Sequence, residues 1–123
     1  MKLHLRFPRT ERLKSRKSID ALFQKGKRFS LGEFRFIYQF RSATGIQVGV
    51  GASSKQFKRA VDRNRIKRLI RESYRLDQVR WKEALKQQQQ GLDLFILFTG
   101  RSLPDYPTCQ QHVHQAWAKI FPE

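Results

Sequence analysis

Residues 60–75 carry the side chains that are best suited to chemistry with a polyanion. This stretch fits one helix, because four apolar residues recur at the spacing of a single buried stripe: Ile66, Leu69, Ile70 and Tyr74. Five polar residues, four of them cations, lie along one edge beside that stripe and are called the basic edge: Asn64, Lys67, Arg68, Arg71 and Arg75. A helix that needed only solubility would alternate charge signs at i,i+4. The basic edge therefore predicts a surface that binds a negatively charged partner.

Further cations flank the basic edge. We expect Lys55 and Arg59 before the helix, Arg63 and Arg65 in its first turns, and Arg12 and Lys14 near the N-terminus to join it in binding. The acidic residue Glu72 is expected to point away together with Arg65.

The net charge supports a polyanionic partner such as a nucleic acid. The 123 residues include 26 Lys and Arg against 10 Asp and Glu, which gives +16. Residues 55–75 hold nine cations and two acids, whereas residues 76–123 hold five of each. The basic function therefore belongs to the first two thirds of the chain, and the last third is expected to be structural.

The length predicts one domain over residues 1–123, with a basic arm at residues 1–10. The single cysteine, Cys109, cannot form an intrachain disulfide, and we expect a cytoplasmic location. The longest apolar run, residues 92–98, is far shorter than the roughly 20 residues of a membrane span, and residues 1–9 lack the apolar segment of a signal peptide. We expect no membrane partner.

The N-terminal region divides into an arm and a short helix. Residues 1–14 are either a disordered tail or an extended arm that contacts phosphates, and the sequence leaves both open. Ile19, Leu22 and Phe23 then predict a two-turn helix that Ser18 caps and Gly26 ends. A helix this short must dock on the rest of the chain.

Strict alternation over residues 33–41 predicts a strand with four aromatic residues on one face: Phe34, Phe36, Tyr38 and Phe40. These rings suit core packing, but they could also stack on unpaired RNA bases. Further strands are predicted over residues 46–51 and 92–98, paired in parallel across the basic helix. Residues 77–90 continue that helix or form a second one, which Gly91 ends.

A final helix is expected after Pro104 and Pro107, with Thr108 as its cap. Its apolar stripe packs on the sheet: Val113, Ala116, Trp117, Ile120 and Phe121. His112 and His114 lie on different sides of this helix, which favours surface histidines over a shared metal ion.

The run A-V-D-R-N-R-I-K-R-L-I-R-E at residues 60–72 resembles the R-N-R signature of the bacterial ribonuclease P protein subunit. The similarity extends over roughly residues 11 to 121, through landmarks that include Arg12-Leu13-Lys14, Val48-Gly49-Val50 and Gly91-Leu92-Asp93. The resemblance implies a single α+β domain, in which a short N-terminal helix, a central mixed sheet of about four strands and a packed C-terminal helix surround the basic helix. It also implies that this helix lies in a left-handed β-α-β crossover.

The resemblance implies a site as well as a fold. An aromatic-lined cleft beside the basic helix would bind the single-stranded 5′ leader of precursor transfer RNA, and we assign Phe23, Phe36 and Tyr38 to it. The sequence does not fix which face of the sheet lines this cleft. Asn64 would contact RNA or a metal-bound water, and the arginines and Lys67 would contact phosphates.

No set of side chains suited to protein-based catalysis stands out in the sequence. The resemblance therefore implies an RNA-binding subunit of an endoribonuclease, whose RNA subunit carries catalysis with Mg²⁺ and removes the 5′ leader. The alternative is a structural or ribosomal RNA-binding protein without a processing role. A DNA-binding helix-turn-helix protein fits poorly, because strands flank the long basic helix, and we expect no DNA partner.

Overall fold

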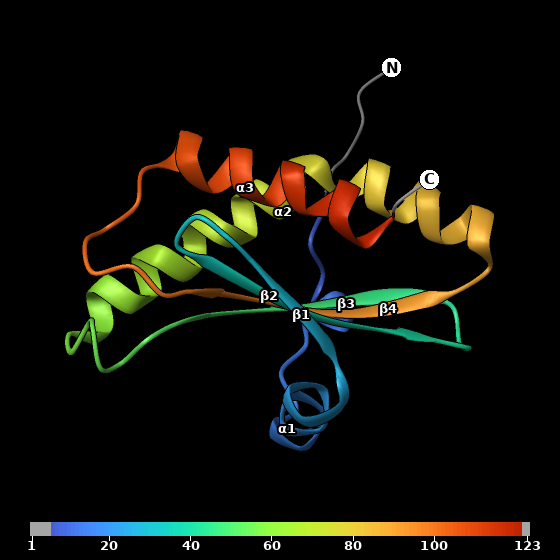
Figure 1. Cartoon of the computed structure of the whole chain (residues 1–123), viewed down its shortest axis with the longest axis horizontal. Coiled ribbons are helices and arrows are strands. Elements are labelled where there is room, and N and C mark those ends of the chain that lie inside the picture. Colours follow the sequence, from blue (N-terminus) through green and yellow to red (C-terminus); the bar gives the residue numbers. More distant parts are fainter. Residues whose placement is uncertain (1–5, 122–123) are drawn as a thin grey trace.

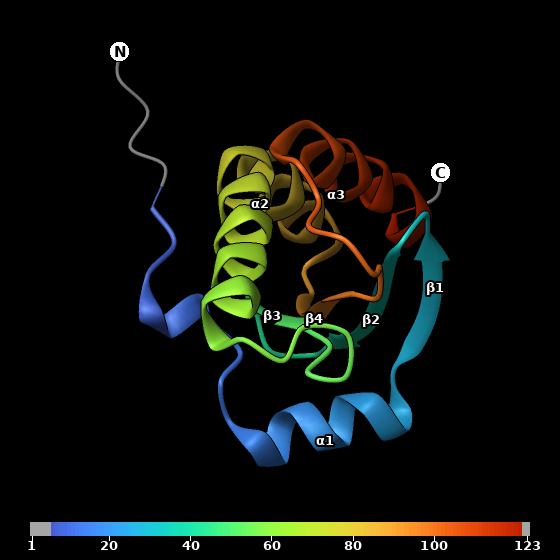
Figure 2. The same cartoon turned by 90° about the vertical axis from the view of Figure 1, so that its left-hand side faces the viewer.

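The computed structural model describes residues 6–121, in which a four-stranded sheet separates one helix from two others (Figures 1 and 2). In Figure 1 the sheet is seen edge-on, with α2 and α3 above it and α1 below it. The elements in chain order are a 3-10 turn (Arg9–Glu11), α1 (Arg16–Lys25), β1 (Lys27–Leu31), β2 (Phe34–Arg41), β3 (Gly45–Ala52), α2 (Ala60–Gln88), β4 (Gly91–Phe98) and α3 (Tyr106–Ile120).

The strands are ordered β1-β2-β4-β3, so β4 enters the sheet between two strands that precede it in the chain. β3 and β4 pair in parallel with Val48 opposite Leu94, which confirms the predicted pairing across the basic helix. β2 pairs antiparallel with both β1 and β4. The sheet is therefore mixed, as expected, and β1 is a strand that no individual sequence pattern predicted.

The two faces of the sheet bury different cores. One face packs against α2 and α3, where Phe34 and Phe36 of β2 share a cluster with Ile66 and Ile70 of α2. The other face packs against α1, where Ile37 and Phe95 surround Leu22. Because side chains alternate along a strand, every second residue of β2 belongs to each face.

The short helix α1 begins earlier than its sequence pattern indicated. Ser15, not Ser18, is the N-cap, and its Oγ accepts a hydrogen bond from the Ser18 backbone N–H at 3.4 Å. The predicted end at Gly26 is confirmed, since the Gly26 N–H donates to the Leu22 carbonyl. The guanidinium of Arg28 also donates to the Phe23 carbonyl, which satisfies a second acceptor at this helix end.

The N-terminal arm is docked over its described part, so a disordered tail is the wrong interpretation for residues 6–14. The Phe7 ring is buried against Tyr74 of α2, with 5.3 Å between ring centroids. The Leu13 N–H donates to the Val48 carbonyl at 2.9 Å, which attaches the arm to β3. Residues 1–5 of the predicted arm lie outside the described residues.

A single helix runs through both segments that the sequence left as one helix or two. α2 continues to Gln88, and the chain turns at Gln89, whose φ of 55° is left-handed. Gly91 is already the first residue of β4, so it does not end the helix as expected. The predicted apolar stripe is confirmed: Ile66, Ile70 and Tyr74 are fully buried, and Leu69 packs against the same core.

The C-terminal helix α3 packs along the second half of α2. Its cap is Asp105 rather than Thr108: the Asp105 carboxylate accepts from the Thr108 N–H at 2.9 Å. Val113, Ala116 and Ile120 are buried as predicted.

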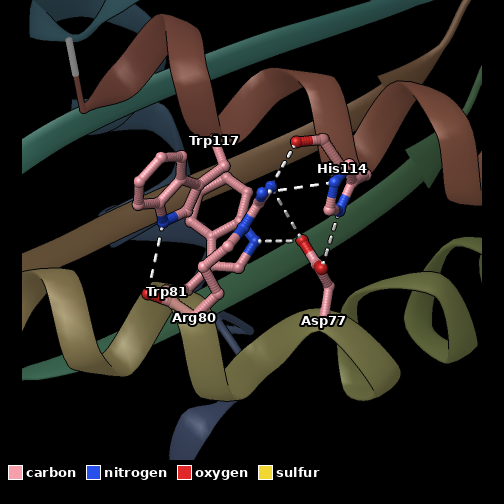
Figure 3. Close-up of polar contacts among 5 residues, drawn as sticks. All are labelled: Asp77, Arg80, Trp81, His114 and Trp117. Atoms are coloured by element: carbon pink, nitrogen blue, oxygen red, sulfur yellow. Dashed lines mark hydrogen bonds and ion pairs between the residues drawn. The ribbon is translucent and has the colours of Figure 1, made fainter. Parts of the chain in front are cut away.

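A polar clamp joins the two helices, and it consists of Asp77, Arg80 and Trp81 on α2 with His114 and Trp117 on α3 (Figure 3). Asp77 accepts from the Trp81 indole at 2.9 Å and from His114 Nδ1 at 3.0 Å. Arg80 donates to the His114 carbonyl and covers the Trp117 ring, with its guanidinium carbon 4.4 Å from the ring centroid.

Candidate nucleic-acid interface

The basic edge occupies the first half of α2, on the flank that faces the N-terminal arm. The buried stripe of Ile66, Ile70 and Tyr74 fixes the rotation of the helix, because turning it would bring these apolar side chains into water. Asn64 and Arg68 are then exposed, and Lys67 and Arg71 are half-buried. The same packing that forms the core therefore places the cations at the surface.

The central cations of this edge have no anionic partner in the part of the chain that the structure describes. Among the described residues, Lys67, Arg68 and Arg71 form no ion pair, and neither does Arg65 on the neighbouring exposed side. The pKa of Arg71 is lowered by burial, by the positive charge of Arg12 and by that of Arg68. Like charges are thus held close together, which favours an external anion.

Arg63 has a structural task in addition to any contact with a partner. Its Nη1 donates to the Phe57 carbonyl at 2.7 Å and to the Lys58 carbonyl at 2.8 Å. These bonds hold residues 53–59, the loop that leads into α2, against the first turn of the helix. The first arginine of the R-N-R run therefore positions the loop that carries Lys55, Lys58 and Arg59, all of which are exposed.

Arg75 is compensated within the chain, contrary to its expected place in an unpaired series. Its Nε and Nη2 donate to the two carboxylate oxygens of Glu72 at 2.9 and 2.6 Å. Glu72 therefore points toward the end of the basic edge and not away with Arg65. This bond keeps the pKa of Glu72 below its usual range, so the pair is ionised at neutral pH.

The remaining predicted cations lie around this edge. Lys14 is exposed, and Arg12 is half-buried between the arm and α2. Arg59 is exposed, and its Nε lies 4.0 Å from Oδ2 of Asp62. Arm, loop and helix thus each contribute cations next to the basic edge. The arm meets α2 near the middle of the helix, where Phe7 packs on Tyr74 and Glu11 pairs with Lys82 (Figure 2).

The three aromatic residues assigned to one cleft lie on opposite faces of the sheet. Phe36 is fully buried in the core under α2 and α3, and Tyr38 packs against the same core beside Phe29 and Phe40. Phe23 projects from α1 onto the other face, where its ring meets Phe95 edge-on at 5.1 Å. The shared cleft is therefore wrong, because alternation along β2 sends Phe36 and Tyr38 away from Phe23.

The sheet face on the side of α1, called here the α1 face, carries cations that the sequence analysis missed. Arg28 and Arg35 are exposed there, and Arg41 is tied to Asp93 by a 2.9 Å ion pair. The Phe95 ring lies over Gly49, where a Cβ atom would come within 2.7 Å of it. The alternation in β2 does predict Arg35 on the face opposite the aromatic residues. The cleft was assigned to the aromatic face, so the cations on the α1 face were not included in it.

Acidic residues do not gather into a metal site in the described part of the chain. Within residues 6–121, no group of three His, Cys, Asp or Glu side chains is close enough to hold a metal ion. The two acids in the first half of α2, Asp62 and Glu72, both face arginines. Mg²⁺ prefers several oxygen ligands around one position, and these side chains do not provide them.

No helix in residues 6–121 has the length and apolar character to span a membrane.

Residues 7–121 match the family model described as Ribonuclease P. The chain belongs to the ribonuclease P protein family. Among curated relatives, the ribonuclease P protein component of Porphyromonas gingivalis strain ATCC 33277 is 32% identical over 91% of this chain and 84% of its own length. That of Dictyoglomus turgidum is 32% identical over 92% of this chain and 91% of its own.

A solved structure supports the same fold. The ribonuclease P protein of Thermotoga maritima superposes with a TM-score of 0.68 at 22% identity, covering 89% of this chain and 97% of that one. The chain is thus an α+β protein of the ribonuclease P type, and its role is that of a subunit of ribonuclease P. A ribosomal or purely structural role is not favoured.

Proposed function

We propose that this ribonuclease P subunit binds its RNA partner through the first half of α2, the preceding loop and the N-terminal arm, while the RNA carries catalysis. One observation supports this assignment above the others: Lys67, Arg68 and Arg71 have no ion-pair partner among the described residues. Phosphate groups of a folded RNA would supply the missing negative charge, and release of their counterions would drive binding.

The single-stranded 5′ leader of precursor transfer RNA is assigned to the α1 face. The opposite face is filled by α2 and α3, so no base can reach Phe36. The α1 face offers the half-buried Phe23 ring together with exposed Arg28 and Arg35. Aromatic rings beside cations are what sequence-tolerant binding of unpaired nucleotides requires.

Mg²⁺ is assigned to the RNA. The described carboxylates do not gather around one position, whereas RNA phosphates and bases are rich in oxygen ligands. The protein contributes positive charge that lets phosphates approach one another, and no step of the reaction is assigned to its side chains.

The test of this function is a pull-down followed by reconstitution. The full chain should retain one RNA of a few hundred nucleotides, and the complex should cleave the 5′ leader from precursor transfer RNA only when Mg²⁺ is present. The chain freed of nucleic acid should cleave nothing. Retention of ribosomal RNA without processing, or cleavage that survives removal of all RNA, would reject the proposal.

The position of the leader has its own test. Phe23→Ala should weaken binding of precursors with a leader, but not of mature transfer RNA, which has none. Tyr38→Ala is the matched control on the other face of the sheet and should leave both affinities unchanged per folded molecule. The opposite pattern would return the leader to the face under α2 and α3.

A further inference from the structure

Three arginine side chains from two segments converge where the N-terminal arm meets α2. Arg12 comes from the arm, whereas Arg68 and Arg71 lie one turn apart on the helix. Burial and the charges of Arg12 and Arg68 together lower the pKa of Arg71. Contacts along the arm place Arg12 beside this part of the helix: the Arg12 guanidinium carbon lies 5.3 Å from the centroid of the Phe7 ring, and Phe7 packs on Tyr74, which is one turn from Arg71.

The nearby acids do not neutralise this cluster. Glu11, next to Arg12 in the chain, pairs with Lys82 at 2.9 Å. Glu72, next to Arg71, pairs with Arg75 at 2.6 Å. Among the described residues, none of the three clustered arginines has an ion-pair partner. The cluster therefore keeps three positive charges.

The arm is fixed here by contacts that need no anion. Phe7 packs on Tyr74, and the Leu13 N–H bonds to Val48. The guanidinium carbon of Arg12 lies over the Phe7 ring, 5.3 Å from its centroid. These contacts hold Arg12 beside two like charges, which a free side chain would avoid.

Arg12 also carries an unsatisfied donor. Its Nε is shielded from solvent and has no hydrogen-bond partner within residues 6–121. Buried donors are nearly always paired in folded proteins, so an unpaired one at a triple-cation cluster indicates an acceptor that belongs there.

We propose that Arg12, Arg68 and Arg71 form a site for one phosphate group, which ties the N-terminal arm to α2. A phosphate offers several acceptor oxygens, and guanidinium groups bind it through paired N–H donors. The inference deepens the proposed function, because the phosphate would come from the RNA backbone; inorganic phosphate has the same chemistry and serves as the probe.

Such a site makes arm docking and phosphate binding reciprocal. A phosphate that bridges the two segments binds only when the arm is in place, so it must also stabilise the docked arm. RNA bound along α2 would thereby order the arm as well.

Hydrogen exchange of the full chain tests this coupling at one amide. The Leu13 N–H reports arm docking, since it donates to Val48 across the junction, and the central β4 amide of Leu94 reports the sheet. Inorganic phosphate is titrated against sodium chloride at equal ionic strength. At ten times its Kd, phosphate should slow Leu13 exchange about tenfold, and much less at Leu94.

Two variants separate a bound phosphate from general screening. Arg71→Gln lies on the helix and keeps every contact of the arm, so in chloride Leu13 should exchange no faster than in the unchanged chain. Its phosphate response should disappear. Arg101→Gln removes the same charge at an exposed loop position and should respond like the unchanged chain.

The outcomes distinguish this site from the function on which it rests. If phosphate and chloride protect Leu13 alike, or if Arg71→Gln keeps the full response, the site is wrong. RNA binding that still weakens in Arg68→Gln would then leave the proposed function intact. Unchanged RNA affinity in Arg68→Gln would reject the proposed function separately.

Discussion

The two halves of α2 differ both in composition and in electrostatic arrangement: residues 60–75 hold six cations and two acids, and residues 76–88 hold three cations and two acids. In residues 76–88, three of the charged side chains have partners within the chain: Asp77 binds Arg80 and His114 (Figure 3), and Lys82 binds Glu11 and Gln78. In residues 60–75 the central cations Lys67, Arg68 and Arg71 have no such partner among residues 6–121. One continuous helix therefore pairs Asp77, Arg80 and Lys82 within the chain in its second half, whereas the central cations of its first half can bind an external anion.

This difference shows how to separate structural from functional charge. A positive charge does not by itself identify a residue that binds RNA. Arg63 and Arg75 belong to the basic series, yet both form hydrogen bonds within the chain. Unpaired cations held close together oppose folding through repulsion, and they persist where binding needs them. Substitutions in the second half should thus change stability, and those in the first half should change affinity.

The largest expected effect is the loss of stability on Trp81→Ala. Trp81 is fully buried, lies against Tyr74 and Phe121, and donates to Asp77. Removing the ring should lower the free energy of unfolding by about 3–5 kcal/mol. Urea unfolding followed by fluorescence of Trp117 measures the loss, and RNA affinity per folded molecule should not change. A weaker affinity at full stability would contradict the division of the helix.

Asp77→Asn should have the next largest effect, again on stability. The carboxylate accepts hydrogen bonds from His114 and Trp81 and forms an ion pair with Arg80, and a neutral amide group cannot replace all three interactions. The free energy of unfolding should fall by roughly 1–3 kcal/mol. Glu83→Gln removes one exposed acid from the same half and should change stability little, so it controls for net charge.

Periodicity predicted much of the fold. The stripe of Ile66, Ile70 and Tyr74, the alternation in β2 and the apolar β4 each depend on a local repeat that burial preserves. β1 escaped because only Phe29 and Leu31 face the core, which is too short a pattern to recognise. Helix ends were misplaced by a few residues, since several polar residues near each end could act as the cap.

The site was predicted in part. The sequence shows which residues share one face of a helix, but it does not show which contacts they form with distant segments. The gathering of Lys67, Arg68 and Arg71 along one edge depends only on their positions in one helix, and the sequence predicted it. The bond from Arg63 to the loop depends on backbone carbonyls that a helical wheel cannot show. The cleft failed at Phe36 because alternation defines two faces of a strand but not which of them α2 and α3 will cover.

Arg68→Ala should change affinity and leave stability intact. Arg68 is exposed, is unpaired among the described residues and faces Arg71, so its removal relieves repulsion. RNA affinity should fall by up to about fivefold, equivalent to about 1 kcal/mol. The log–log salt dependence should also become less steep by roughly 0.7–0.9 for the lost phosphate contact. Filter binding over a salt series measures both, and an unchanged slope would place Arg68 outside the interface.

The smallest effect should have the opposite sign, at the border between the two halves. Glu72 binds Arg75 through both carboxylate oxygens, and this bond keeps the pKa of Glu72 below its ordinary value of 4.5. Because the pKa is lowered, the pair persists at neutral pH and is lost only as the pH falls below that ordinary value. Glu72→Gln removes the negative charge at every pH and leaves the Arg75 guanidinium with a weaker partner. The positive charge of Arg75 would then be less fully compensated, so RNA affinity at pH 7 should rise slightly and its salt dependence should steepen by at most one phosphate contact. Asp62→Asn is the matched control, because it removes an acid from the same half at the distant end of the helix, where the carboxylate lies 4.0 Å from exposed Arg59. If Glu72→Gln weakens RNA binding at unchanged stability, Glu72 orients Arg75 for RNA, and the border between the two halves lies beyond Arg75.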